Sequence, residues 1–209
     1  MKNLALLSPL FVLLIWACQP DGKEKEPIPI QVEVAPDGLL TEIDTARLTR
    51  VDSLVHIIDT TANNSGSGVT INHFYRSDED RVQYFEKDGQ LWRCIVTTEI
   101  DTLETRSVFY WREGKQQFIR LREWRKHPHP SPKSKEVLIF FEDGKIVAIT
   151  ERSKLLGGEP PSALYPVPHE ITKRPVEAVV AEYAWYLVPA LKAIETKKAA
   201  DRDGGNNNQ

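Results

Sequence analysis

The chain has 209 residues, of which 41% are hydrophobic and 27% are charged, and its formal net charge is -3. Such a composition is typical of one globular domain plus tails, and the chain is long enough to bury a hydrophobic core. Because the net charge is slightly negative, it excludes nucleic acid as an expected partner.

The first 18 residues have the pattern of an export signal. Lys2 precedes an apolar run from Leu4 to Trp16, which is too short to span a bilayer comfortably. The run ends in Ile15-Trp16-Ala17-Cys18, which resembles the lipobox of bacterial lipoprotein precursors. The resemblance implies that residues 1–17 are a signal peptide that is removed and that Cys18 carries acyl chains such as palmitate, which anchor the protein to a membrane. A plain signal peptide, or an uncleaved anchor with a chance cysteine, is the alternative.

Residues 18–27 are polar and contain prolines, so we expect a flexible tether. Gln19 follows the cysteine, where an aspartate would favour inner-membrane retention in the lipoprotein sorting rule of enteric bacteria. Asp21, Glu24 and Glu26 look somewhat like the surface-export signal of some Bacteroidota lipoproteins. We therefore expect a location in the cell envelope, with the outer membrane favoured and its face left open.

Residues 28–200 are predicted to form a single domain that begins with a strand and a helix. Apolar and polar residues alternate from Ile28 to Val34, and the prolines at 27 and 29 restrict such a strand to a sheet edge. Leu39–Thr61 has apolar residues near helical spacing, with Asp37 or Thr41 as the expected N-cap. A Gly/Ser loop follows.

A long antiparallel meander is predicted from Val69 to Arg152. An aromatic pair precedes a charged turn that ends in glycine at three places, which predicts three β-hairpins, each with a type I turn followed by a bulge. The turn glycines are Gly89, Gly114 and Gly144. The predicted strands are Val69–Arg76, Arg81–Glu86, Gln90–Ile100, Glu104–Arg112, Lys115–Lys126, Lys135–Glu142 and Lys145–Arg152.

The C-terminal part is predicted to be an irregular segment followed by a helix. The helix starts at Thr172 or Lys173, and Pro189 is expected to kink it. Residues 201–209 are expected to be a disordered tail. The predicted fold class is therefore α+β: an antiparallel β-meander of six to eight strands with an N-terminal and a C-terminal helix packed on it, both on one face.

The strand Lys115–Lys126 carries the candidate binding residues. Side chains of a strand alternate between its two faces. One face therefore carries Phe118, Arg120, Arg122 and Trp124, and the other carries Ile119, Leu121 and Glu123. Arginines between aromatic residues make a plausible surface for an anionic partner. The candidate residues are Phe118, Arg120, Arg122, Trp124, Arg125 and Lys126. The alternative is a solvated sheet face on which the arginines lie over apolar surface and pair with acidic turns.

No catalytic or cofactor motif is found, so the sequence predicts no catalytic residue, no cofactor and no metal. His127 and His129 are spaced to chelate a metal with His169 or a nearby carboxylate as a third ligand, but the prolines on both sides favour a solvent-facing loop. Cys94 lies within a predicted strand and is expected to be buried and inert. The acids between 78 and 104 are expected mostly in solvated turns.

Three function classes remain open. The first is a non-catalytic envelope lipoprotein that binds an anionic or protein partner. The second is a carrier of an apolar ligand between a curved sheet and the kinked helix, and the third is an unrecognised hydrolase. The aromatic residues expected to line the carrier's cavity are Trp92, Trp111, Trp124, Trp185 and Tyr186.

The lipid anchor is tested by intact-mass spectrometry of the protein purified from its native membrane fraction. We expect a mature chain that starts at Cys18 and carries added acyl mass, and a Cys18→Ser variant without that mass. An unmodified, soluble wild-type protein would contradict the lipoprotein assignment.

Overall fold

The computed structural model describes residues 33–35, 38–40, 42–66, 68–72, 74, 79–125, 134–154, 164 and 166–205. Two helices lie within these ranges, α1 (Thr45–Asn64) and α2 (Val176–Gly205). The strands are β1 (Glu33–Val34), β2 (Val69–Asn72), β3 (Arg81–Lys87), β4 (Gln90–Ile100), β5 (Leu103–Arg112), β6 (Lys115–Arg125), β7 (Ser134–Glu142), β8 (Lys145–Lys154) and β9 (Glu170–Ile171). Cys18, the predicted tether and most of the first predicted strand lie outside the described residues.

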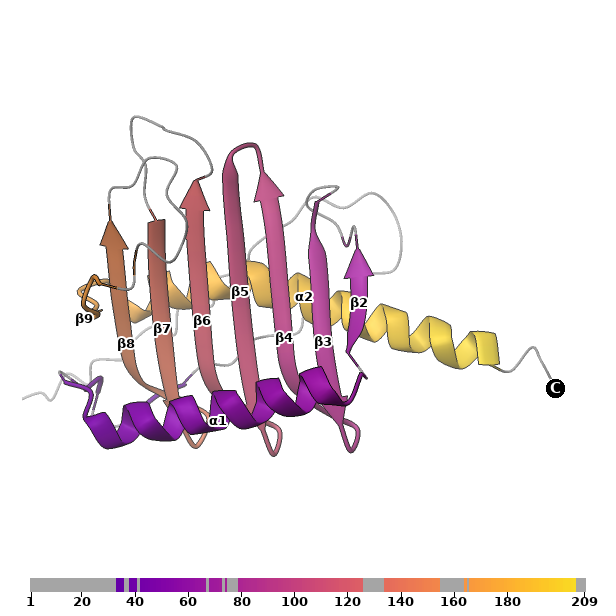
Figure 1. Cartoon of the computed structure of the whole chain (residues 1–209), viewed down its shortest axis with the longest axis horizontal. Helices are drawn as coiled ribbons and strands as arrows, with labels where there is room; N and C mark the ends of the chain where they lie inside the picture. Colours follow the sequence, from indigo (N-terminus) through magenta and orange to yellow (C-terminus); the bar gives the residue numbers. More distant parts are fainter. Residues whose placement is uncertain are drawn as a thin grey trace, which may run out of the picture.

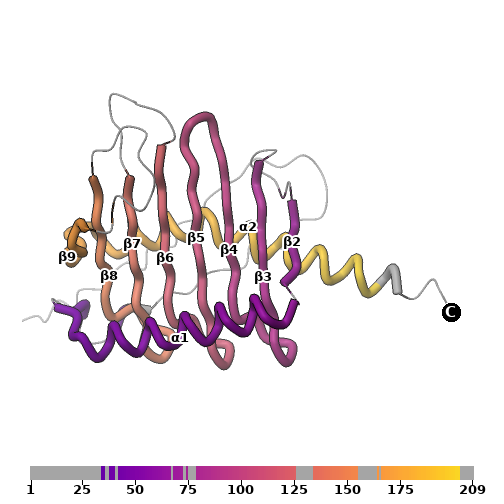
Figure 2. The backbone as a smooth tube through the Cα atoms, viewed as in Figure 1, coloured from indigo at the N-terminus to yellow at the C-terminus, as the bar shows by residue number. Residues whose placement is uncertain are grey.

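The described strands form one sheet in the order β1-β8-β7-β6-β5-β4-β3-β2, and β9 also pairs with β8. Strands β2 to β8 follow one another across the sheet in chain order (Figure 2). All of their pairings are antiparallel, whereas β1 pairs with β8 in parallel at the sheet edge. The predicted α+β class, with an antiparallel meander between two helices, is confirmed.

The three predicted hairpins are present, but their turn type differs from the prediction. In each turn, both the acidic residue and the glycine after it have positive φ; in the first they are Asp88 (53°) and Gly89 (73°). Two central residues with positive φ form a type I′ turn, whose twist matches that of the flanking strands. The expected type I turn was therefore wrong. The other two turns are Glu113-Gly114 and Asp143-Gly144.

Each hairpin also contains one β-bulge at the same place. The pairing skips one residue on the second strand, three positions after the turn glycine. An extra residue of this kind bends its strand and increases the local twist. The skipped residues are Trp92 in β4, Gln117 in β6 and Val147 in β8.

The two helices cover opposite faces of the sheet, as Figure 1 shows, with α1 in front and α2 behind. Neighbouring residues of β6 illustrate the division, because Phe118 packs in the cluster with Ile58 of α1 and Ile119 packs in the cluster with Tyr183 of α2. The expectation that both helices lie on one face was therefore wrong. Several strands contain a run that is apolar at every position, such as Val137–Phe141 within β7, and the residues of both faces then need cover.

Both helices also differ from their predicted limits. Helix α1 starts at Thr45, and its N-cap is Asp44, whose Oδ1 accepts a hydrogen bond from the backbone N–H of Arg47 at 2.6 Å. The expected caps, Asp37 and Thr41, lie outside the described residues. The described segment before α1 is tied to the sheet, since the N–H of Leu40 donates to the carbonyl of Val147 at 2.9 Å.

Helix α2 continues through Pro189 and includes residues 201–205, which were expected to belong to a disordered tail. A proline removes only one backbone N–H from a helix. Its neighbours Leu187 and Ala190 are 4% and 0% exposed, so packing against the sheet holds the helix together across the proline.

Adjacent residues of α1 provide a test of this packing. Ile58 is 1% exposed in the core beneath α1, whereas Ile57 is 53% exposed. We expect Ile58→Ala to lower the free energy of unfolding by about 2–5 kcal/mol, because it leaves a cavity in a packed core. The matched variant Ile57→Ala should change it by less than about 1 kcal/mol. Urea unfolding followed by circular dichroism measures both, and equal losses would contradict the described orientation of α1.

Candidate functional site: an arginine-rich sheet face and the groove beneath α1

The predicted basic strand is β6, and its two faces are divided as the sequence indicates. Phe118 packs on the α1 side, with its ring centroid 5.3 Å from that of Phe140. The guanidinium carbon of Arg120 lies 5.6 Å from the Phe118 ring centroid. Ile119 and Leu121 point to the α2 side. Phe118 is therefore a core residue, and Arg120 lies over it.

A buried carboxylate, Glu136 of β7, holds the neighbouring cations on the α1 side. Its side chain is 2% exposed. Oε1 accepts a hydrogen bond from Nε of Arg122 at 2.6 Å, and Oε2 accepts one from Nε of Arg152 at 2.7 Å. Nε2 of His169 lies 3.1 Å from the same Oε2, and Nε of Arg120 lies 3.7 Å from Oε1. Two arginines of the predicted surface thus already face an internal partner.

The surroundings of Glu136 determine its charge. Burial alone would raise the pKa of this carboxyl, but the hydrogen bonds from His169 and Arg122 and the charges of Arg122 and Arg152 outweigh burial. The pKa of Glu136 therefore lies well below its usual range, and the side chain is ionised at neutral pH. One negative charge is buried among three arginines.

Four arginines of this face lie in one row across the sheet, which we call the arginine row. Its members occupy positions in register on β3, β5, β6 and β8, with Glu136 in the same row on β7. They are Arg81, Arg106, Arg122 and Arg152. Arg106 lies directly opposite Arg122, an arrangement of like charges that destabilises a sheet.

Arg81 and Arg106 are the exposed end of the arginine row. Within the described part of the chain, neither side chain has an ion pair or a hydrogen bond. Sequence reasoning missed both residues, and it also missed Glu136, because strand register brings the three together from β3, β5 and β7. The alternation of Arg106 with Val108 and Tyr110 is the one local signal that pointed to this face.

The remaining sequence candidates are dispersed. Trp124 and Arg125 are half-buried at the end of β6. Lys126, His127 and His129 lie outside the described residues, and His169 faces Glu136. No group of three or more His, Cys, Asp or Glu side chains in the described ranges is placed to hold a metal ion.

The aromatic residues proposed to line a carrier cavity do not converge. Trp92 packs on the α1 side of the sheet and Trp111 on the α2 side, so the sheet itself separates them. Trp185 is 60% exposed on α2. A single cavity between the sheet and α2 cannot be lined by all of them.

Two single-residue expectations have clear outcomes. Cys94 is buried as predicted, and burial raises the pKa of its thiol to about 12, which keeps it protonated and unreactive. Asp80 departs from the expectation of solvated turn acids, since it is 1% exposed.

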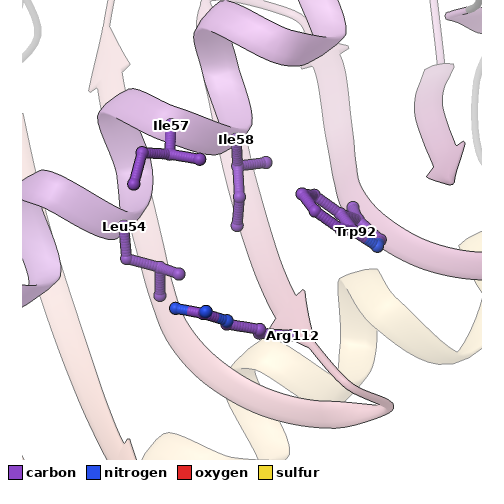
Figure 3. A pocket seen from close by; sticks show the side chains of 5 residues that line it. All are labelled: Leu54, Ile57, Ile58, Trp92 and Arg112. Carbon is purple, nitrogen blue, oxygen red and sulfur yellow. The ribbon is translucent and has the colours of Figure 1, made fainter.

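A groove beneath α1 is the second feature of this face. A cavity of about 90 Å³ lies between α1 and the sheet. It is lined by Leu54, Ile57, Ile58, Trp92 and Arg112 (Figure 3). A neighbouring cavity of about 420 Å³ also has Leu54 and Arg112 in its wall. The two cavities therefore adjoin. Of the bulge residues, Trp92 lines the smaller cavity and Gln117 lines the larger one.

The larger cavity is lined by both apolar and charged side chains. Arg47 is held by Glu142, whose Oε1 accepts hydrogen bonds from Nε at 3.0 Å and from Nη2 at 2.6 Å. Arg50 and Arg112 also line it and are more exposed.

Among the described residues, neither α1 nor α2 contains a stretch apolar enough to span a bilayer.

The role of Glu136 is tested by comparison with Glu142 on the same strand. Glu136→Gln removes the only carboxylate that the described structure places within 4.0 Å of Arg120 and Arg122, and leaves these half-buried cations uncompensated. We expect a loss of about 3 kcal/mol in the free energy of unfolding, measured by urea denaturation at pH 7. Glu142→Gln should lower the free energy of unfolding by less than about 1 kcal/mol, because the Glu142 side chain is 50% exposed.

The difference between wild type and Glu136→Gln should also depend on pH. A carboxylate with a depressed folded pKa stabilises the protein above its unfolded-state pKa of about 4.3 and loses this contribution as the pH falls below it. The difference in urea midpoint should therefore be constant above about pH 6 and shrink toward pH 3. A difference independent of pH would contradict the ionised state of Glu136.

No family model matches the chain, and neither the curated proteins nor the solved structures include a significant match.

Proposed function

We propose that the protein is a lipid-anchored lipoprotein of the cell envelope that acts as a non-catalytic binding module for an acidic protein partner. The anchor is supported by the lipobox-like residues Ile15 to Cys18, and the residue after the cysteine favours the outer membrane. The tether of residues 18–27 would hold the domain away from the lipid surface.

The observation that carries the proposal is the surplus of positive charge in the arginine row. Four arginines and one carboxylate occupy this row, and Glu136 is already hydrogen-bonded to two of the arginines. Arg106 lies opposite Arg122 without a partner among the described residues, so the protein alone leaves a like-charge contact uncompensated. A bound carboxylate would remove that repulsion.

The chemistry of arginine favours carboxylates from a protein over a diffuse negative charge. A planar guanidinium donates two parallel hydrogen bonds to one carboxylate, which gives geometric specificity as well as attraction. Arg81 and Arg106 are on strands separated by one strand, with Thr97 between them in the same row. An acidic segment laid across these strands would meet successive arginines, and steering by opposite charge would speed its association.

Site-specific photo-crosslinking in native cells tests this function. Gln83 is exposed on the same face as Arg81, two residues along β3, and Glu195 is exposed on α2. We expect a crosslinker at Gln83, but not at Glu195, to capture a discrete partner whose contact region is acidic. The capture should fall about tenfold or more in an Arg81→Glu, Arg106→Glu variant, because two attractive charges become repulsive.

Salt and fold controls accompany this experiment. Capture should weaken with added salt, as exposed charge pairs are screened. Both arginines are exposed, so the double variant should keep the wild-type urea midpoint to within about 1 kcal/mol. No adduct at Gln83, or an adduct indifferent to the two arginines, would refute the proposed binding face.

A further inference from the structure

We infer that the groove beneath α1 is a binding site for an anionic amphiphile, a molecule with one phosphate or carboxylate group attached to an apolar chain. This site is separate from the arginine row, because α1 crosses the sheet at the end that carries the three hairpin turns (Figure 1). The inference stands independently of the proposed protein partner.

The smaller cavity supplies the apolar part of the site. Leu54, Ile57 and Ile58 of α1 line one side of its volume of about 90 Å³, and Trp92 faces them from the sheet (Figure 3). Trp92 is the extra residue of a β-bulge, a device that re-aims a side chain next to a site. Ile57 is 53% exposed at this cavity, so a bound chain would cover apolar surface that the protein leaves in water.

The larger cavity supplies the cations. The side chains of Arg50 and Arg112 are 65% and 61% exposed. Their ion pairs in the described structure, to Glu142 at 3.9 Å and to Glu113 at 3.7 Å, are longer than hydrogen bonds. Both guanidinium groups therefore retain donors for an anion, which Arg forks bind strongly.

The acids at this cavity already have closer partners. Glu142 accepts two hydrogen bonds from Arg47, and Asp143 lies 3.2 Å from Nζ of Lys115. Three arginines, Arg47, Arg50 and Arg112, and two acids, Glu142 and Asp143, line this cavity, so one positive charge remains in excess, and it is unchanged when the adjoining Lys115 and Glu113 are counted. The charge of the site therefore favours an anionic group.

The connection between the cavities determines the kind of ligand. Arg112 and Leu54 line both, so an anion bound by Arg112 would have its substituent next to the apolar cavity. The larger volume of about 420 Å³ falls in the range of small-molecule sites, in which apolar walls carry a few convergent polar groups. An inorganic anion would leave the apolar walls unused, and an uncharged hydrocarbon would leave the arginines unused.

Calorimetric titration of the full chain tests the inference. The chain carries Cys18→Ser, so that no acyl group of its own competes for the groove. The probes are octyl phosphate, butyl phosphate and inorganic phosphate, and the separate source of the same headgroup is a vesicle containing phosphatidic acid. We expect octyl phosphate to bind about tenfold or more tightly than butyl phosphate, because additional methylene groups are buried, and inorganic phosphate to bind most weakly.

Variants at the cationic end and at the apolar end of the groove test the two contributions to binding separately. Arg112→Gln and Arg50→Gln should each weaken octyl phosphate binding about tenfold, as expected for loss of a charged hydrogen bond. Ile57→Asn should abolish the advantage of octyl over butyl phosphate. The matched control is Arg202→Gln, an exposed arginine of α2 outside the groove and outside the arginine row, which should leave binding unchanged. All four positions are exposed, so the variants are expected to fold, and urea midpoints check this.

Three results would overturn the inference. They are the absence of octyl phosphate binding, equal affinity for octyl and inorganic phosphate, and binding to the vesicles without binding to the monomeric alkyl phosphates. The last result would assign the groove to contact with a membrane surface instead of an enclosed ligand. Photo-crosslinking at Gln83 is unaffected by these results, so failure here and failure of the proposed partner binding are distinguishable.

Discussion

The constraint on which the rest of the structure depends is a sheet that is apolar on both faces. Successive residues of β6 and β7 alternate between two hydrophobic clusters, and each cluster needs cover from water. The chain supplies one helix before the meander and one after it, and each helix packs on a different face. Ion pairs then fix the second helix, since Glu182 of α2 accepts a hydrogen bond from Lys135 of β7 at 2.8 Å and also pairs with Arg174.

The repeated hairpins connect this architecture to the groove beneath α1. Each type I′ turn is followed at a constant distance by a bulge, so an extra side chain enters the same end of the α1 face three times. Two of these extra residues, Trp92 and Gln117, line the cavities beneath α1. The hairpin geometry therefore contributes to the walls of the groove, and Glu142 and Asp143 of the third hairpin line its larger cavity.

The α1 face has two electrostatic parts. In the satisfied part the charged side chains have partners of opposite charge, and in the unsatisfied part they have no partner among the described residues. Around Glu136, hydrogen bonds and charge pairing outweigh the cost of burial, which is the condition under which a buried ion is tolerated. Further along the same row, Arg106 lies opposite Arg122 and carries the same charge, and Arg106 has no partner among the described residues. The segment that contains His169 packs against the satisfied part, where Nδ1 of His169 lies 3.3 Å from Oγ1 of Thr150. The unsatisfied part faces solvent.

The elements and their order could be predicted from local patterns in the chain. Alternation, turn glycines and helical spacing are local signals, so the seven meander strands, both helices, the buried Cys94 and the division of β6 into two faces followed from them. Type I′ turns were missed because the sequence does not state whether the acidic residue before the glycine also adopts positive φ. Which face each helix covers, the pairing of Arg122 and Arg152 with Glu136, and the groove beneath α1 were decided by tertiary structure. These depend on strand register and on which surfaces meet, and residues far apart in the chain carry no local signal of their contact.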